Sequence, residues 1–269
     1  MKPSFPEAQL VDTPNGKVPK LYSCAECRSG AGLDFSFSMA FQPIVDWNQK
    51  KIYSHEALVR GTKGESAYSI LSKVNQTNRY QFDQSCRIKA IQLASQIQIP
   101  ALLNINFLPN AVYQPETCIR TTLEASREYN FPLNRLVFEL TEGEEVQDHN
   151  HIINIFKAYQ KYGFLTAIDD FGSGYSGLNL LAKFQPDIIK LDMELIRNIH
   201  INSVAQKLTK AIAGVCREIG ISVIAEGVET IEELKVLVDM GINLYQGYLF
   251  SKPAFESVGE LQFPDLSKK

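Results

Sequence analysis

The stretch that decides the fold is residues 188–241, IIKLDMELIRNIHINSVAQKLTKAIAGVCREIGISVIAEGVETIEELKVLVDMG. Within it, two short runs rich in Ile, Leu and Val, 188–191 and 222–225, alternate with two longer segments of helical patterning, 203–219 and 231–240. Strands that are joined through a helix pair in parallel, because a parallel pair needs a long crossover connection. The stretch therefore predicts a parallel sheet built from repeated strand–helix units.

The same alternation continues on both sides of this stretch, from residue 35 to residue 248. The further candidate strands are 39–45, 52–60, 101–107, 136–140, 166–169 and 244–248, and the further helical patterns are 82–96, 118–129 and 150–162. Gly163, Gly220 and Gly241 each follow a helical segment, where a left-handed cap favours glycine. About eight strands that alternate with helices predict a closed α/β barrel of the TIM type.

The first two strands, 39–45 and 52–60, break this pattern. Only a short polar turn, DWNQKK, separates them, which is the spacing of a β-hairpin. The predicted fold class is thus a modified TIM (β/α)8 barrel with an antiparallel first strand pair. Residues 1–34 are rich in Pro, Gly and polar residues with little periodicity, so they predict an N-terminal leader or arm, and 35–269 predict the barrel domain.

The leader contains a CxxC pair, Cys24 and Cys27. Two thiolates are half of a zinc site, and no second CxxC or CxxH follows in the sequence. A redox pair, a zinc site shared across a dimer and an incidental pair all stay open at this point.

Composition narrows the class of protein. The formal net charge is −3 over 269 residues, whereas proteins that bind nucleic-acid polymers or membrane surfaces without specificity are usually basic. The first residues lack the apolar core of a secretory signal, and no apolar run approaches the roughly 18 residues of a membrane span. Five scattered cysteines, an odd number, suit a reducing compartment. We therefore expect a cytoplasmic protein without membrane insertion.

The predicted strands end in polar residues. They are Glu56, Asn106, Glu139, Asp169, Asp170, Lys190, Asp192, Glu226, Glu229 and Gln246. Strand side chains alternate between faces, so Glu139 must oppose Phe138 and Leu140, which would pack against the outer helices. The polar residues would then point inward near the C-terminal strand ends, where barrel active sites are built.

Several carboxylates in one partly buried mouth repel one another and lose hydration, and divalent cations remove both problems. An all-oxygen set of Glu, Asp and Asn selects Mg²⁺ or Mn²⁺ and disfavours zinc, and the carboxylates suffice for two ions. Asp169 and Asp170 would point apart in a regular strand, but the Gly-rich turn after them lets the backbone reorient. Two metals can drive an in-line phosphoryl displacement. Lys190 would supply positive charge to the attacking water or a phosphate, and Arg60 would bind a phosphate oxygen.

Nine sequence motifs occur in order along 37–253. They are FQPIVD, EALVRG, FDQSCR, INF, FELTE, AIDDFGSGYSGL, PDIIKLD, IAEGVE and QGYLFSKP. This set resembles the EAL family of cyclic-dinucleotide phosphodiesterases, which is named for the tripeptide found here as Glu56-Ala57-Leu58. The resemblance implies a modified TIM barrel with an antiparallel first strand pair, and hydrolysis of cyclic di-GMP (c-di-GMP) to linear pGpG in bacterial signalling.

The resemblance also implies roles for individual residues. The expected ligands of two Mg²⁺ or Mn²⁺ ions are Glu56, Asn106, Glu139, Asp169, Asp170 and Glu229. Lys190 would hold or help to deprotonate the attacking water, with support from Glu226, and Gln246 would orient the site. Gln42 and Arg60 would meet the substrate, and Asp192 and the segment 248–253, with Phe250 and Pro253, would line the nucleotide pocket. Asn104 shares a face with Asn106, but INF followed by Leu-Pro makes Asn106 the better match.

In the family the loop after the paired aspartates, 171–178 here, links metal binding to a dimer interface, and Glu142 resembles the glutamate that anchors it. A homodimer through this loop is therefore expected, although Gly177 adds backbone freedom to it. Two other functions stay open. They are a catalytically silent c-di-GMP receptor or interaction scaffold, and a phosphodiesterase for another nucleotide.

Overall fold

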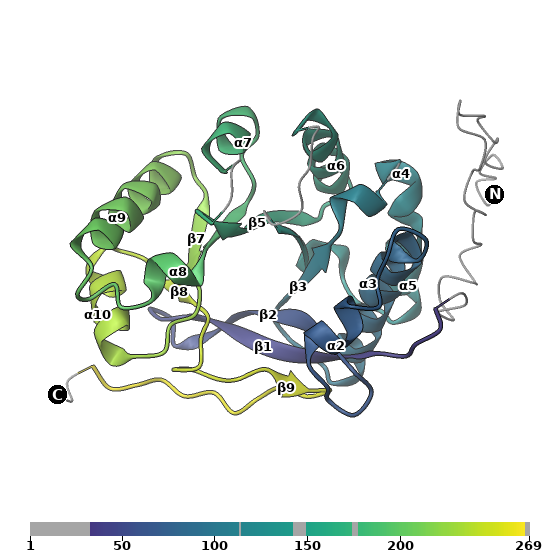
Figure 1. Cartoon of the computed structure of the whole chain (residues 1–269), viewed down its shortest axis with the longest axis horizontal. Helices are drawn as coiled ribbons and strands as arrows, with labels where there is room; N and C mark the ends of the chain where they lie inside the picture. Colours follow the sequence, from purple (N-terminus) through teal and green to yellow (C-terminus); the bar gives the residue numbers. More distant parts are fainter. Residues whose placement is uncertain (1–32, 113, 142–148, 174–176, 267–269) are drawn as a thin grey trace.

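A computed structural model describes residues 33–112, 114–141, 149–173 and 177–266. Its strands form a closed ring with the helices outside (Figure 1). The strand order is β2-β3-β4-β5-β6-β7-β8-β1, pairing of β1 with β2 closes the ring, and β9 joins the outer edge of β1. The predicted TIM-type barrel is confirmed.

The strands are β1 Ser38–Asp46, β2 Lys51–Arg60, β3 Leu102–Phe107, β4 Leu136–Thr141, β5 Leu165–Phe171, β6 Ile188–Leu191, β7 Ser222–Ala225, β8 Leu244–Tyr245 and β9 Ala254–Phe255. The helices are α2 Ala67–Leu71, α3 Arg79–Gln96, α4 Pro115–Cys118, α5 Arg120–Glu128, α6 His149–Lys161, α7 Gly177–Lys183, α8 Met193–Ile196, α9 Ser203–Glu218 and α10 Ile231–Asp239. Two short 3-10 turns, η1 Pro109–Ala111 and η2 Leu133–Arg135, precede α4 and β4.

The direction of β1 differs from that of the other barrel strands. It pairs antiparallel with both β2 and β8, whereas every other neighbouring pair in the ring is parallel. The predicted antiparallel first pair is therefore confirmed. Gln42, the central residue of β1, lies opposite Glu56 of β2 in this antiparallel pair.

The helix ends follow local signals. Gly163, Gly220 and Gly241 have φ values of +86°, +77° and +80°, as expected of left-handed caps. The helix expected over 118–129 begins earlier and is divided at Ile119 into α4 and α5. Pro115 occupies the first turn of α4, where its missing N–H costs nothing, so the helical segment starts there.

Two apolar layers hold the barrel together. Between the sheet and the outer helices, the ring of Phe138 packs against those of Phe107, Tyr159 and Phe164, at centroid distances of 4.8–6.2 Å. The outward orientation predicted for Phe138 is thus confirmed. Inside the barrel, toward the N-terminal strand ends, six buried side chains fill the interior: Ile44, Val137, Ala167, Ile188, Ile224 and Leu244. We call these six residues the apolar plug.

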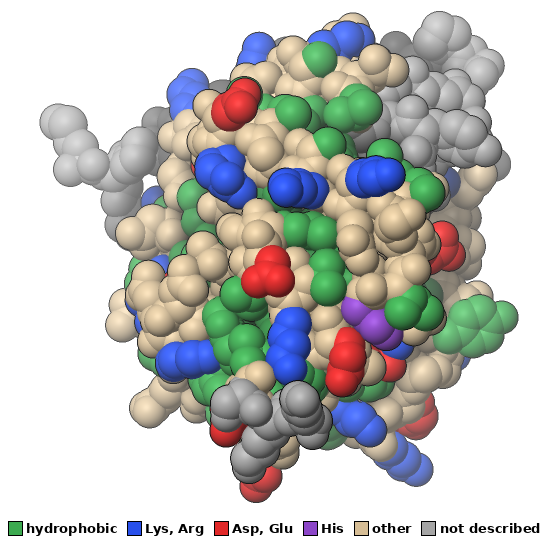
Figure 2. Space-filling model, turned by 90° about the vertical axis from the view of Figure 1, so that its left-hand side faces the viewer, with side chains coloured by type: hydrophobic (Ala, Val, Ile, Leu, Met, Phe, Trp, Pro, Cys, Tyr) green, Lys and Arg blue, Asp and Glu red, His purple; other side chains and the backbone are tan. Residues whose placement is uncertain are grey.

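The outer face formed by α9 and α10 carries no single-sign field of charge. Figure 2 shows Lys, Arg, Asp and Glu side chains interspersed with apolar ones on this face. Exposed apolar residues of α9 include Val204, Leu208 and Val215, and Ile219 directly after the helix is exposed as well. Across the described ranges, none of the helices combines the length and the apolar character needed to cross a bilayer.

Candidate active site

Strand alternation builds the site directly above the apolar plug. In five strands, a residue of the plug is followed two positions later by a polar residue on the same face. The pairs are Val137 and Glu139, Ala167 and Asp169, Ile188 and Lys190, Ile224 and Glu226, and Leu244 and Gln246. The polar members all lie at the C-terminal ends of their strands, which is the catalytic end of this barrel type.

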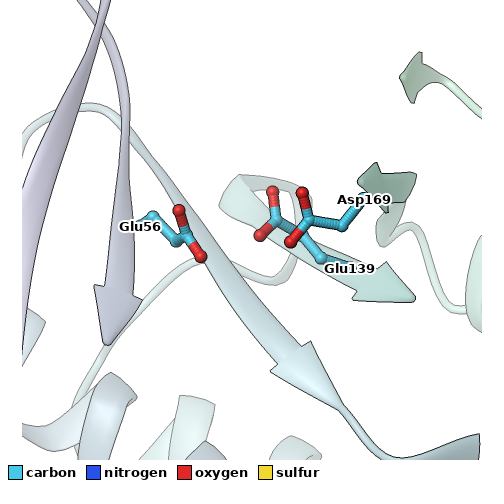
Figure 3. Close-up of side chains that lie close together, drawn as sticks. All are labelled: Glu56, Glu139 and Asp169. Atoms are coloured by element: carbon cyan, nitrogen blue, oxygen red, sulfur yellow. The ribbon is translucent and has the colours of Figure 1, made fainter. Parts of the chain in front are cut away.

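Lys190 occupies the centre of this polar layer, with its side chain only 1% exposed. Its Nζ lies 3.2 Å from Glu56 Oε2, 3.2 Å from Glu139 Oε2, 3.0 Å from Asp169 Oδ1 and 2.6 Å from Glu226 Oε1. Four carboxylates from four strands or strand ends thus converge on one ammonium group. Figure 3 shows three of them, with Glu56 from β2 facing Glu139 and Asp169 from β4 and β5.

Neutral amides orient two of the carboxylates. Asn106 Nδ2 donates to Glu56 Oε1 at 2.8 Å, and Gln246 Nε2 donates to Glu56 Oε2 at 2.7 Å. Asn104 Nδ2 donates to Glu139 Oε1 at 2.6 Å. These charge-assisted hydrogen bonds hold the carboxylates in one rotamer. Both asparagines of β3 therefore contact the site, each through a different glutamate.

Asp169 and Asp170 reach the same region because the backbone leaves the regular strand. Asp170 has a φ of +54°, and the pairing of β5 with β6 shifts register between Ile168 and Phe171. The reorientation predicted for the end of this strand is confirmed. Asp169 belongs to two sets of carboxylates whose oxygens lie within 4.8 Å of one another, one with Glu56 and Glu139 and the other with Asp170 and Glu226.

Crowding of negative charge raises several pKa values. Burial, with further contributions from Glu56 and Asp169, raises the pKa of Glu139 to about 8 although Lys190 opposes the shift. Burial and the neighbouring Asp169 raise the pKa of Asp170 to about 6. Burial would lower the pKa of Lys190, but the surrounding carboxylates outweigh it and hold that pKa well above its usual range. Lys190 therefore stays protonated and acts as a hydrogen-bond donor.

The donor set fits hard divalent cations. With all four ionised, these carboxylates would carry −4 against +1 on Lys190, an excess that a proton held by Glu139 partly relieves. The ligand atoms offered in these two sets are carboxylate oxygens, and this chemistry suits Mg²⁺ or Mn²⁺. Divalent cations would cancel the excess negative charge that burial makes costly.

The carboxylates open into a cavity of about 320 Å³. Its lining consists of Gln42, Glu56, Leu58, Asp169, Asp170, Lys190, Met193, Glu226, Gly227, Glu229, Gln246, Gly247 and Tyr248. Gly247 is needed for the local geometry, because a Cβ there would lie 2.0 Å from the carbonyl oxygen of Val228. The loops after β7 and β8 are therefore in close backbone contact beside Gln246.

Of three residues predicted to contact a substrate, Gln42 lines the cavity, whereas Arg60 and Asp192 do not. Gln42 lines the cavity and donates to the carbonyl oxygen of Ser251 at 3.1 Å. Arg60 is half-buried, and its Nη1 donates to the carbonyl oxygen of Val59 at 2.7 Å. Asp192 caps α8 by accepting from the Glu194 amide at 2.7 Å.

Neither Phe250 nor Pro253 belongs to the lining of this cavity. The Phe250 ring is buried against Trp47, Tyr245 and Phe263, with centroid distances of 6.0–6.4 Å. Pro253 is half-buried just before β9. Phe250 thus supports the segment that carries Tyr248, because apolar packing of its ring anchors that segment to the outer core.

Glu229 lines the cavity but belongs to neither carboxylate set among the described residues. Its carboxylate is 37% exposed and forms a forked ion pair with Arg197, whose Nη2 donates to Oε1 at 2.9 Å. This hydrogen bond lowers the pKa of Glu229. Glu142, the centre of the loop 171–178 and the CxxC leader lie outside the described residues.

Sequence reasoning undervalued Asn104 and did not single out Gly247. The signal for Asn104 was available in the two-residue period that puts it on the face of Asn106. The close backbone approach at Gly247 had no comparable local signal, because it depends on Val228 from another strand end.

Comparisons with known proteins agree with the barrel fold. The sequence model of the family described as "EAL domain" matches residues 33–253. The blue light- and temperature-regulated antirepressor BluF of Escherichia coli is 30% identical over 84% of this chain, and cyclic di-GMP phosphodiesterase PdeR of the same organism is 38% identical over 51%. The matches span 56% and 21% of the length of these two relatives.

Two solved structures have the same fold. A standalone versatile EAL protein from Vibrio cholerae O395, in its c-di-GMP bound form, is 54% identical with a TM-score of 0.84 and covers 88% of this chain and 100% of its own. BlrP1 of Klebsiella pneumoniae, in a complex with manganese and cyclic di-GMP, is 37% identical with a TM-score of 0.80 and covers 84% of this chain and 58% of its own.

Proposed function

Because the chain belongs to the EAL domain family, we propose that it hydrolyses cyclic di-GMP to linear 5'-pGpG with two Mg²⁺ or Mn²⁺ ions, and so lowers this second messenger in a bacterial signalling system. The observation that carries the proposal is the convergence of four carboxylates on Lys190, in two oxygen sets that share Asp169. The complexes of similar EAL proteins with c-di-GMP and with manganese support both the substrate and the metal class.

We assign metal binding to Glu56, Asn106, Glu139, Asp169, Asp170 and Glu229. When bound, two divalent cations supply an activated water and stabilise the attacking and leaving oxygens of a phosphodiester displacement. Lys190, held protonated by its carboxylate neighbours, donates a hydrogen bond to the attacking water or to a phosphate oxygen. Glu226 keeps the Lys190 ammonium in place through the 2.6 Å contact, and Gln246 fixes Glu56.

Substrate binding is assigned to the cavity and its rim. A volume of about 320 Å³ lies in the range of small-molecule sites. Gln42 and Arg60 would donate to the dinucleotide, while Asp192 and the segment ending at Pro253, supported by Phe250, would shape the nucleotide pocket. Arg60 reaches a phosphate only by giving up its present bond to the Val59 carbonyl.

The deciding experiment is incubation of the full chain with cyclic di-GMP and Mg²⁺ or Mn²⁺, followed by chromatography of the products. Parallel samples contain EDTA, Ca²⁺ in place of the catalytic metal, or the Glu56→Gln variant. We expect pGpG only with Mg²⁺ or Mn²⁺ and the native site, because the looser coordination of Ca²⁺ positions the nucleophile poorly. Rapid turnover in EDTA or by Glu56→Gln would refute the two-metal assignment.

The second candidate is a c-di-GMP receptor or interaction scaffold without turnover. It is favoured by the similarity to BluF, an antirepressor. Calorimetric titration of cyclic di-GMP in the presence of Ca²⁺ separates the two functions. Tight binding without product in any metal favours the receptor, whereas binding in Ca²⁺ together with pGpG formation in Mn²⁺ favours the enzyme. A different cyclic nucleotide that is hydrolysed faster would instead point to another substrate.

We also propose a homodimer that forms through the loop after Asp170, acting in the cytoplasm. In the described part of this region, Leu178 at the start of α7 is 71% exposed, so an apolar side chain is accessible to such an interface. Glu142 would anchor the loop, and residues 1–34 would form a leader outside the barrel domain. Light scattering of the native chain and of Leu178→Ser tests the interface, and an unchanged dimer in the variant would move it elsewhere.

A further inference from the structure

A buried ionic cluster lies outside the barrel wall, on α3. Asp83 and Arg87, one helical turn apart, form an ion pair with an Nη2–Oδ2 distance of 2.8 Å, and their side chains are 1% and 0% exposed. Neither residue lines the catalytic cavity. A buried ion pair is weak evidence for stability, because desolvation of both charges offsets their attraction and apolar replacements are often neutral or stabilising. The pair therefore calls for an explanation other than stability.

The aspartate of this pair holds the end of β3. Asp83 Oδ1 accepts from the Leu108 amide at 2.9 Å. Leu108 is the first residue beyond β3, so its N–H has left the strand ladder. It lies two positions after Asn106, whose amide contacts Glu56 in the site. Asp83 thus satisfies the backbone donor that follows the end of a strand carrying a proposed metal ligand.

The arginine contacts the outer faces of β3 and β4. Its guanidinium carbon lies 5.0 Å from the Phe138 ring centre and 5.7 Å from that of Phe107. Arg87 Nη1 also donates to the Tyr159 hydroxyl oxygen at 2.8 Å. Burial raises the pKa of Tyr159 to about 12, so the phenol stays neutral.

Strand alternation connects these contacts to the site. Phe107 is the neighbour of Asn106 and Phe138 is the neighbour of Glu139, and successive side chains of a strand point to opposite faces. The cluster therefore lies on the outer face of the sheet, behind the points where Asn106 and Glu139 project inward. Gln84 extends the cluster by donating to Asp83 Oδ2 at 3.1 Å.

We propose that Asp83 is a positioning residue of the metal site and that Arg87 is the counter-ion that allows its burial. Asp83 fixes the end of β3 through the Leu108 amide and so sets the direction of Asn106, while Arg87, which contacts Phe138 and Tyr159, neutralises the charge of Asp83. Functional side chains must be held to within about 0.5 Å of the productive geometry, so such support from behind the strand has a direct effect on metal affinity. This inference deepens the proposed function and rests on it.

The test compares two double variants of the full chain. Asp83→Leu with Arg87→Met removes the ion pair and the acceptor for Leu108, whereas Asp83→Asn with Arg87→Met removes the ion pair but keeps an oxygen acceptor. Mn²⁺ binding is measured by calorimetry without substrate, unfolding by urea titration, and kcat and KM with cyclic di-GMP. We expect the first variant, Asp83→Leu with Arg87→Met (the Leu/Met variant; the second is the Asn/Met variant), to bind Mn²⁺ about 10- to 100-fold more weakly. This is the loss typical of mutations in residues that orient metal ligands.

The Asn/Met variant should bind Mn²⁺ within about threefold of the native chain, well inside that range. Native affinity in a folded Leu/Met variant would overturn the inference, and so would equal losses in both variants, because the Leu108 acceptor would then have no effect. If either double variant does not fold, Leu108→Pro against Leu108→Ala decides, since only the proline removes the amide donor. Native-like Mn²⁺ affinity in Leu108→Pro would then overturn the inference.

Failure of the proposed function gives a different result. A native chain that binds Mn²⁺ but forms no pGpG leaves the positioning test intact, because that test is read from metal affinity alone. A native chain that binds no Mn²⁺ refutes the metal site and the positioning role together.

Discussion

The two ends of the barrel interior are built from the same strands but have opposite chemistry. Toward the N-terminal strand ends, the apolar plug is buried and contains only aliphatic side chains. Two residues further along five of these strands, the interior contains Glu139, Asp169, Lys190, Glu226 and Gln246. A shift of two residues along each strand, one period of its side-chain alternation, therefore separates the apolar core from a cluster with excess negative charge.

This difference teaches where stability and function reside. The plug gains free energy from every apolar group that it buries. The polar layer places four carboxylates around one lysine, and burial raises the pKa of Glu139 and Asp170 because their charges are poorly compensated. A site of this kind costs stability in exchange for ligand binding, and the plug beneath it supplies the rigidity.

The largest expected effect comes from removing the carboxylate that both oxygen sets share. Asp169→Asn should lower pGpG formation by more than about 10³-fold, because it weakens both metal positions at once. The matched control is Asp187→Asn, which makes the same change at the opposite end of the barrel, where the carboxylate accepts from Thr166. Product chromatography should find the control close to native, and comparable losses in both would contradict a functional difference between the two ends.

A large effect on stability, with little on chemistry, is expected within the plug. Ile188→Ala should lower the free energy of unfolding by about 2–5 kcal/mol, because a fully buried Ile leaves a cavity. Urea titration measures the loss, and calorimetry of the folded variant should find native Mn²⁺ affinity. A variant of native stability but impaired Mn²⁺ binding would reverse the comparison.

A smaller effect on hydrolysis is expected from a change at Gly247, which lies next to Gln246 of the polar layer. Gly247→Ala places a Cβ against the Val228 backbone and must displace the adjacent Gln246. Hydrolysis should fall on the order of 10- to 100-fold, as expected for a displacement of about 1 Å. Gly214→Ala on α9, where a Cβ meets nothing within 4 Å, is the control and should be fully active. Native kcat and KM in Gly247→Ala would show that Gln246 tolerates the shift.

The smallest effect is expected at the exposed ion pair. Arg197→Ala releases Glu229, which lines the cavity, and should strengthen Mn²⁺ binding about two- to fivefold, since an exposed pair competes only weakly. Arg217→Ala serves as the control, because Arg217 is an exposed residue of α9 that donates to the Met240 carbonyl oxygen and does not line the cavity. Weaker binding by Arg197→Ala would mean that Arg197 supports the site.

Much of the fold and of the site could be predicted because the relevant signals are local. Alternation along residues 136–140 predicted that Phe138 points outward and Glu139 inward, and both orientations are observed. The Gly caps at 163, 220 and 241 and the antiparallel first pair follow equally from short sequence patterns. The metal roles and the substrate contacts stay predictions until the chain is assayed.

Other features required contacts between distant residues. No local pattern indicates that Arg197 pairs with Glu229, that Phe250 packs against Tyr245, or that Asn104 contacts Glu139. Each depends on how the ring of strands closes and on which loops then meet.

The sequence by itself determined the barrel class, the direction of its first strand pair and the polar residues that end its strands. It did so because strand period, helix period and cap preferences act within a few residues. Only the tertiary structure decided that four carboxylates share Lys190, that Asp169 joins both oxygen sets, and that Asp83 holds the end of β3. These arrangements depend on the closure of the barrel, which brings together side chains that are far apart in the sequence, such as Glu56 and Glu226 around Lys190.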